Sequence, residues 1–205
     1  MKIKLKYFTY IMIVFFSSCQ SQSRMDLSEL TLSEDLLVMI PKSERTLFSL
    51  DKVDPATGTP AFTTYEVQKY RYKNIEFKQP ELGHNQVTFY TYKALKEGSD
   101  NQISGFSFDL EDRNEELFTI LKKQYGKPEE LTPVPTYTLE EVLHGHNSFV
   151  WRKNEISIIL SYSYSSLNDK QRIRTTVYII NNDAKDLTFP EQISVNRLIE
   201  THKQR

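Results

Sequence analysis

The spacing of apolar positions along the chain changes several times, and each spacing predicts a different element of secondary structure. Alternation of apolar and polar residues, with many tyrosines, phenylalanines and β-branched residues, is typical of half-buried strands. Six stretches have this pattern, three before residue 112 and three after residue 147. The predicted strands cover residues 63–77, 87–95, 103–110, 148–152, 156–164 and 172–181.

One stretch between the two groups of strands has helical spacing instead. Residues 112–115 offer an N-terminal cap, Gly126 suits the position after the last turn, and Pro128 prevents the helix from continuing. The apolar residues of this helix are Leu117, Phe118, Leu121 and Tyr125. A shorter helix is expected after Thr31, which fits a capping box with Glu34.

The order of these elements predicts an α+β domain. Three strands, one main helix and three further strands favour a mostly antiparallel sheet of about six strands packed on that helix. Short flanking helices are expected after Thr31, near Thr138 and after Pro190, and residues 165–171 should form a polar loop. A change of phase near Lys69 and the glycine at position 105 both suggest β-bulges.

Composition adds mainly exclusions. The 205 residues suit a single domain, and a formal charge of −1 gives no strong field that would attract nucleic acid. The chain has one cysteine, Cys19, which excludes an intramolecular disulfide and a zinc cluster built from cysteines.

The amino terminus has the pattern of a secretory signal. Three lysines within the first six residues precede an apolar run over residues 7–16, and Ser17, Ser18 and Cys19 follow. A basic start, an apolar run of about 7–15 residues and small residues before the cleavage site define such a signal. The run is too short to span a bilayer, which takes about 20 apolar residues.

The sequence Phe16-Ser17-Ser18-Cys19 resembles the lipobox of bacterial lipoproteins, with Phe16 in the place of the usual leucine. The resemblance implies cleavage between Ser18 and Cys19, a lipid on Cys19 and acylation of the new amino terminus. Each buried methylene of an acyl chain contributes about 0.8 kcal/mol, so two or three chains anchor a protein stably. The resemblance covers only the start of the chain and concerns anchoring alone.

This signal divides the chain into three expected parts: residues 1–18 as signal peptide, 19–26 as lipidated tether and 27–205 as a single domain. Its removal takes away three lysines and no acidic residue, which leaves 187 residues with a formal charge of −4. Gln20 follows the cysteine, where an aspartate would imply retention in the inner membrane. Residues 20–24 also lack the acidic cluster that is associated with surface export in some lipoproteins. The resemblance therefore implies an outer-membrane location facing the periplasm.

Basic and aromatic residues alternate over residues 69–73, as in some single-stranded nucleic-acid platforms. On a strand this alternation places the cations on one face and the tyrosines on the other, so we expect a core face and a solvated face instead. Tyrosines also alternate over residues 89–92 and 161–165. For these rows, core packing and an aromatic binding surface both remain open.

Candidate catalytic groups are sparse. His144 and His146 form the closest histidine pair, but no third ligand stands at a diagnostic spacing, which favours a solvated loop over a metal site. The acidic pairs at 115–116, 129–130 and 140–141 are adjacent residues and do not flank a bond as glycosidase carboxylates do. The Gly-x-Ser-x-Gly, glycine-rich phosphate-loop and His-Glu-x-x-His motifs are absent. No catalytic, cofactor-binding or metal-ligating residue is assigned.

We therefore expect a membrane-anchored envelope lipoprotein that binds a protein or an envelope glycan without enzymatic activity. An immunity-like protein that neutralises a toxin and an assembly factor are two forms of this hypothesis. The alternative is an envelope hydrolase or metal-dependent enzyme that uses the region of His144 and His146. A structural spacer is a third possibility. The membrane is the expected partner through Cys19, and neither nucleic acid nor a cofactor is expected.

Overall fold

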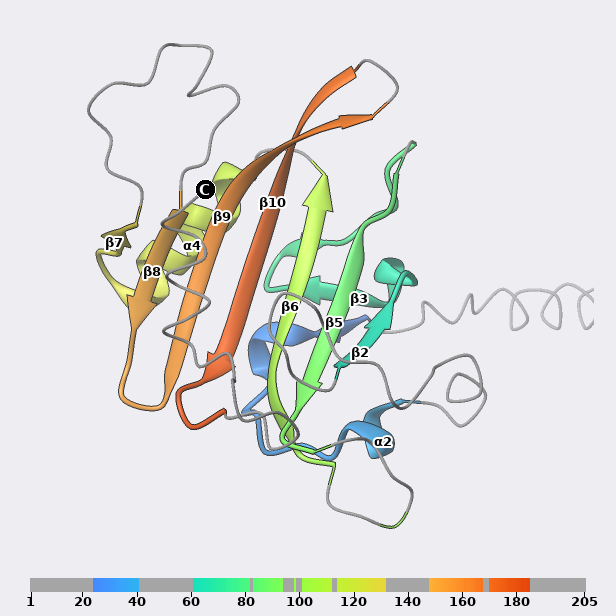
Figure 1. Ribbon diagram of the computed structural model, residues 1–205, viewed down its shortest axis with the longest axis vertical. Coiled ribbons are helices and arrows are strands. Elements are labelled where there is room, and N and C mark those ends of the chain that lie inside the picture. The colour runs from blue at the N-terminus through green and yellow to red at the C-terminus, as the bar shows by residue number, and fades with distance from the viewer. Residues whose placement is uncertain are drawn as a thin grey trace, which may run out of the picture.

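Seven strands form an antiparallel sheet at the centre of the structure (Figure 1). The computed structural model describes residues 24–40, 61–81, 83–93, 98, 101–111, 114–131, 148–167 and 170–184. Across the sheet the order is β2 (Ala61–Thr64), β5 (Gln86–Thr91), β6 (Ile103–Glu111), β10 (Lys170–Asn181), β9 (Ile156–Leu167), β8 (Ser148–Arg152) and β7 (Glu129–Glu130). Strands β8, β9 and β10 are neighbours in the sequence and pair as successive hairpins.

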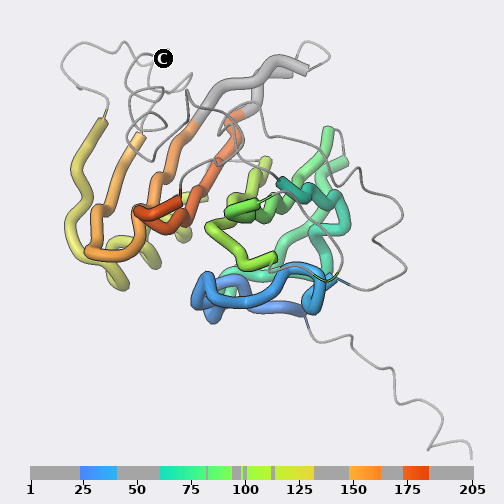
Figure 2. The backbone as a smooth tube through the Cα atoms, turned by 60° about the horizontal axis from the view of Figure 1, so that its bottom comes forward, coloured from blue at the N-terminus to red at the C-terminus, as the bar shows by residue number. Residues whose placement is uncertain are grey.

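A second sheet contains three short strands in the order β1 (Met25–Asp26), β3 (Tyr70–Tyr72) and β4 (Ile75–Glu76). Strand β1 pairs with β3 in parallel, and β3 pairs with β4 in antiparallel orientation. A 3-10 turn, η1 (Leu27–Glu29), follows β1, and another, η2 (Val67–Lys69), precedes β3. Figure 2 shows the N-terminal segment lying beneath the strands of the large sheet.

Two elements cover the apolar face of the large sheet. Helix α4 (Glu115–Tyr125) lies over β8, β9 and β10, where the ring of Phe118 is 4.8 Å from that of Phe149. The small sheet lies over β5 and β6, where the ring of Tyr72 is 5.5 Å from that of Phe108. Both covers contribute to one continuous core cluster, which includes Leu121 of the helix.

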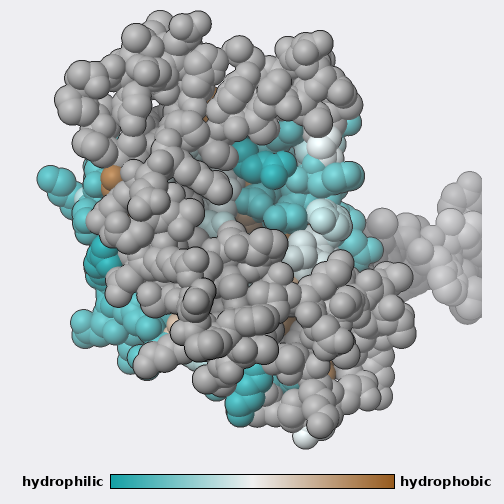
Figure 3. Space-filling model, viewed as in Figure 1, coloured by the Kyte–Doolittle hydropathy of each residue, from teal (hydrophilic) through white to brown (hydrophobic). Residues whose placement is uncertain are grey.

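The opposite face of the large sheet carries more polar residues. The amide of Gln86 donates to Asp109 at 2.7 Å, and the hydroxyl of Thr176 donates to the same carboxylate at 2.5 Å. The hydroxyls of Tyr90 and Ser107 are 2.8 Å apart. Figure 3 looks onto this face, and the described atoms near its centre are mostly hydrophilic. A smaller apolar cluster lies on the same face and comprises Leu131, Val150, Ile159, Ile180 and Ala184.

The expected α+β class, with about six strands packed on one main helix, is wrong. The described part of the chain is mostly β, with ten strands in two sheets and one helix longer than two turns. The stretch 63–77 is not one strand, because it contains the end of β2, the turn η2, and strands β3 and β4. The phase change near Lys69 marks this 3-10 turn and not a bulge. Residues 165–171 are not a loop either, since β9 reaches Leu167 and β10 begins at Lys170.

The main helix and its caps are confirmed. The side chain of Asn114 accepts from the N–H of Leu117 at 3.0 Å, and Gly126 ends the helix with a φ of +87°. The first short helix begins later than expected. In α2 (Leu36–Met39) Asp35 is the N-cap and accepts from the N–H of Leu37. The Thr31–Glu34 contact forms as expected, at 2.9 Å, but it does not start the helix.

The expected bulge beside Gly105 is also confirmed. Tyr90 and Thr91 of β5 pair with Gly105 and Ile103 of β6, so Ser104 is the extra residue. A Cβ atom on Gly105 would lie 2.7 Å from the carbonyl oxygen of Ile179 on β10. Only glycine therefore lets β6 and β10 approach this closely.

Replacing Gly105 by alanine should lower the free energy of unfolding by about 1–3 kcal/mol, because the new methyl group overlaps backbone that cannot move alone. Ser104→Ala is the matched control on the same strand. The Ser104 hydroxyl is buried without a hydrogen-bond partner in the described structure, so its removal should leave stability unchanged or raise it. Urea denaturation of both variants checks this, and equal stability of the two would contradict it.

Candidate functional site

A cleft of about 510 Å³ lies where the two covers of the large sheet meet. One wall is the segment 27–32 after β1, and the other is the turn 153–156 between β8 and β9. Tyr72 of β3 and Tyr125 at the end of α4 lie between these walls, with Phe106 and Ile179 of the large sheet. Small-molecule sites have volumes of about 300–1,000 Å³, so the cleft has the size of a ligand site.

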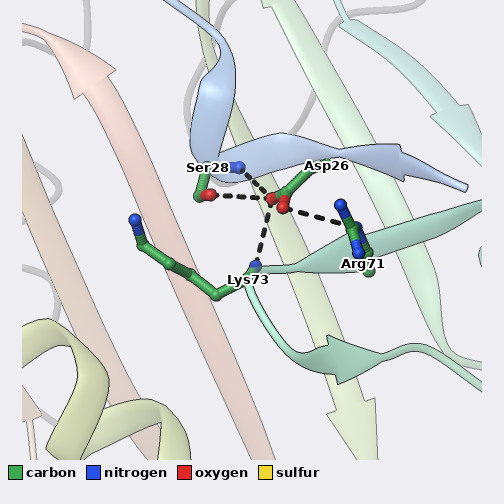
Figure 4. Close-up of polar contacts among 4 residues, drawn as sticks. All are labelled: Asp26, Ser28, Arg71 and Lys73. Atoms are coloured by element: carbon green, nitrogen blue, oxygen red, sulfur yellow. Dashed lines mark hydrogen bonds and ion pairs between the residues drawn. The ribbon is translucent and has the colours of Figure 1, made fainter.

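The first wall is held by the carboxylate of Asp26 (Figure 4). Its Oδ1 accepts from the N–H of Ser28 at 3.0 Å, from the hydroxyl of Ser28 at 2.7 Å and from the N–H of Lys73 at 3.0 Å. Its Oδ2 lies 3.3 Å from Nε of Arg71. One side chain thus joins the N-terminal segment to the β3–β4 hairpin. Lys73 has a φ of +56°, which is unusual for a residue with a side chain, and its hydrogen bond supports this turn.

The surroundings of Asp26 favour its charged form. Burial alone raises the pKa of this carboxyl, but the hydroxyl and N–H of Ser28, the N–H of Lys73 and the charge of Arg71 outweigh it. The pKa of the Asp26 carboxyl is therefore below its ordinary value of 3.8. Glu34, two residues beyond this wall, also has a lowered pKa, because hydrogen bonds from Thr31 and Ser33 outweigh burial.

The second wall is held by Asn182. Its Oδ1 accepts from the hydroxyl of Ser157 at 2.7 Å, and its Nδ2 donates to the carbonyls of Lys153 and Asn154 at 2.7 and 3.2 Å. Its backbone N–H donates to the carbonyl of Glu155 at 2.7 Å. The backbone of this turn is therefore fixed, and residues 153–155 line the cleft.

Between the walls lies a buried phenol. Tyr72 is fully buried, and its hydroxyl makes no hydrogen bond of ordinary geometry in the described structure. Burial, together with the neighbouring hydroxyl of Tyr125, raises the pKa of Tyr72 far above its usual value. The Tyr125 hydroxyl accepts from the side chain of Gln124 at 3.0 Å. Tyr72 therefore stays protonated, and its hydroxyl keeps a hydrogen that it can donate.

Several residues singled out in the sequence lie outside the described ranges. They are the lipidation and cleavage residues Ser18 and Cys19, the histidines His144 and His146, and the acidic pair at 140–141. The lipid anchor and the histidine site consequently remain predictions.

The interpretation of residues 69–73 is confirmed. Tyr70 and Tyr72 are buried in the core, whereas Arg71 is exposed on the other side of the strand. Tyr90 and Tyr162 are likewise buried, which supports the core interpretation for these members of the tyrosine rows. A tyrosine can belong to the core and also border the candidate site, as Tyr72 does at the cleft.

The two acidic pairs within the described ranges lie at a helix start and on an edge strand, not in the cleft. Glu115 and Glu116 lie in the first turn of α4, and Glu129 and Glu130 are exposed on β7. Nowhere in the described ranges do three or more histidine, cysteine, aspartate or glutamate side chains gather closely enough to hold a metal ion. None of the described helices is long and apolar enough to cross a membrane.

Sequence reasoning missed this cleft and both residues that hold its walls. The pattern Asp26-Leu27-Ser28 is typical of an Asx turn and could have indicated a local hydrogen bond. Its pairing with residues 71–73 could not be foreseen, because it joins segments more than 40 residues apart. The same holds for Asn182, whose partners lie in the turn at residues 153–155.

Comparison with known proteins gives no relative. No protein-family model, no curated protein and no solved structure matches this chain.

Asp26→Asn should lower the free energy of unfolding by about 1–2 kcal/mol at neutral pH, because it replaces a charged acceptor by a weaker one. A carboxylate with a lowered pKa stabilises the fold fully above its unfolded pKa near 3.8, and this contribution is lost as the pH falls through the folded value. The difference between the native protein and the variant should therefore shrink below about pH 4. Thermal unfolding from pH 7 to 2 measures it.

Glu29→Gln is the control for this series, since Glu29 lies on the same segment but is not among the described partners of the Asp26 carboxylate, which are Ser28, Lys73 and Arg71. Its unfolding curves should follow those of the native protein. Parallel pH profiles for Asp26→Asn and the native protein would contradict the assigned role of Asp26.

Tyr72→Phe should raise the free energy of unfolding by about 1 kcal/mol, because it removes a buried hydroxyl that has no partner. Tyr90→Phe is the matched comparison. It removes a buried hydroxyl that bonds Ser107 at 2.8 Å and should lower stability by about 1 kcal/mol. Urea denaturation separates the two, and a loss of stability in Tyr72→Phe would show that its hydroxyl is already satisfied.

Proposed function

We propose that this protein is an exported, lipid-anchored binding module of the bacterial envelope, and that its ligand site is the cleft between residues 27–32 and 153–156. The signal sequence and the position of Cys19 support export and anchoring. The cleft supports binding, because it has a suitable volume and walls formed by distant segments.

The single observation that carries the binding role is that both walls are fixed in advance. Asp26 holds one wall through three hydrogen bonds and an ion pair, and Asn182 holds the other through four hydrogen bonds. A preformed cleft loses little conformational entropy when a ligand enters, which is typical of binding sites. A fortuitous gap between packed elements would need no such network.

The position of the cleft suits an anchored protein. Cys19 and Arg24 are five steps apart along the chain. A fully extended chain spans about 3.6 Å per step, so this distance is at most about 18 Å. A lipid on Cys19 would therefore hold the small sheet, and with it the cleft, close to the bilayer surface. The side chains of the cleft include one carboxylate, Glu155, whereas glycosidase chemistry uses two. This favours binding over hydrolysis.

In this proposal the partner is a component of the envelope. The protein itself is anchored in the outer membrane and faces the periplasm, since Gln20 and not an aspartate follows Cys19. An immunity-like protein and an assembly factor are both forms of such a binding module. Each would present the cleft to a partner that meets the protein at the membrane.

Replacing Cys19 by serine tests the anchor, with Ser21→Ala as the control. Serine cannot accept the thioether-linked lipid, so Cys19→Ser should leave the membrane fraction after a high-salt wash, whereas Ser21→Ala should stay. Labelled palmitate should enter the native protein and the control only. Identical fractionation of all three proteins would sink the anchoring proposal.

A further inference from the structure

We infer that the cleft binds a neutral saccharide unit, with the phenol hydroxyls of Tyr72 and Tyr125 and the side chains of the 153–155 turn as its hydrogen-bonding groups. The inference rests on the proposed function, because it names the ligand of that same site. It commits to a glycan and not to a protein partner.

The middle of the cleft combines apolar surface with an unused polar group. Phe106, Ile179 and Tyr72 line it with apolar groups, and the Tyr72 hydroxyl makes no hydrogen bond of ordinary geometry within the described residues. An unsatisfied buried hydroxyl is rare in folded proteins, and a ligand that bonds it removes the penalty. A sugar ring matches this surface, since it has apolar C–H faces and hydroxyl groups at its edge.

The rim of the cleft carries donors and acceptors without net charge. Lys153 and Glu155 place one positive and one negative charge on the same turn, with the amide of Asn154 between them. Ser28 and Thr31 add hydroxyls on the opposite wall. A rim whose charges cancel suits a ligand with many neutral hydroxyl or amide groups. It offers no excess positive charge to a phosphate or a carboxylate.

The backbone of the cleft does not favour a peptide. Peptides commonly bind by adding a strand to free backbone groups at a sheet edge. On the 153–155 turn the Lys153 N–H donates to the Ile156 carbonyl, and Asn182 occupies the carbonyls of Lys153, Asn154 and Glu155. The carbonyl groups of this turn are therefore already bonded, which leaves its side chains as the main acceptors for a ligand.

Titration of the full-length lipidated protein in detergent tests the inference, with Trp151 fluorescence as the signal. Trp151 is the only tryptophan, and its indole donates to the carbonyl of Gly126, the residue after Tyr125. The probes are N,N′-diacetylchitobiose, maltose, and the N-acetylglucosamine–N-acetylmuramic acid disaccharide. We expect a saturable signal with at least one of the two neutral sugars at millimolar concentration.

Three variants and one control test whether the sugar binds in the cleft. Tyr72→Phe, Tyr125→Phe and Glu155→Gln should each weaken binding about tenfold through loss of one hydrogen-bonding group. Tyr65→Phe is the matched control, since Tyr65 is 56% exposed, its ring lies tilted against that of His84, and it is not a lining residue of the cleft. It should bind as the native protein does. Glu155→Gln changes a turn side chain and keeps the test valid if a buried tyrosine variant fails to fold.

Three outcomes overturn the inference: no saturable signal with either neutral sugar, equal binding by the cleft variants and the native protein, or saturation by a tetra-alanine peptide in place of the sugars. The last outcome would leave the binding module of the proposed function intact. Conversely, sugar binding in detergent does not depend on Cys19, so a failed anchoring experiment would leave this inference standing.

Discussion

A single helix cannot cover the apolar face of a seven-stranded sheet. The eleven residues of α4 make a cylinder about 16 Å long and about 10 Å wide. Seven strands at about 4.8 Å spacing span about 29 Å, so roughly half of the face needs another cover. The small sheet and the residue that follows it supply this cover with the rings of Tyr70, Tyr72 and Phe77, which pack on β5 and β6. The cleft is the seam between these two covers.

The seam stays open because its two walls are held from outside it. Asp26 joins the N-terminal segment to a hairpin that follows more than 40 residues later, and Asn182 fixes the turn between β8 and β9. Tyr72 belongs to the small sheet and Tyr125 to the helix, so these two residues border the same cleft only because the two covers meet. The two covers, the hydrogen bonds that hold the walls and the candidate site therefore all follow from a sheet that is wider than its one long helix.

The sequence predicted what depends on local chemistry. Helix α4, its Asn114 cap, its Gly126 end and the bulge beside Gly105 all follow from spacing and backbone preference, and all were confirmed. The fold class was wrong because strands of two or three residues, such as β1, β3 and β4, are too short for a period. The cleft was missed because β1 pairs with β3 across a long separation in sequence, which no local pattern encodes.

The seam between the helix and the small sheet is, in our proposal, a preformed ligand site. A crystal structure of the protein grown with N,N′-diacetylchitobiose tests it most directly. We expect the disaccharide to lie between residues 27–32 and 153–156, with a sugar oxygen within hydrogen-bonding distance of the Tyr72 hydroxyl and both walls in place. A cleft closed by side chains, or a sugar bound on the polar face around Asp109 instead, would contradict it.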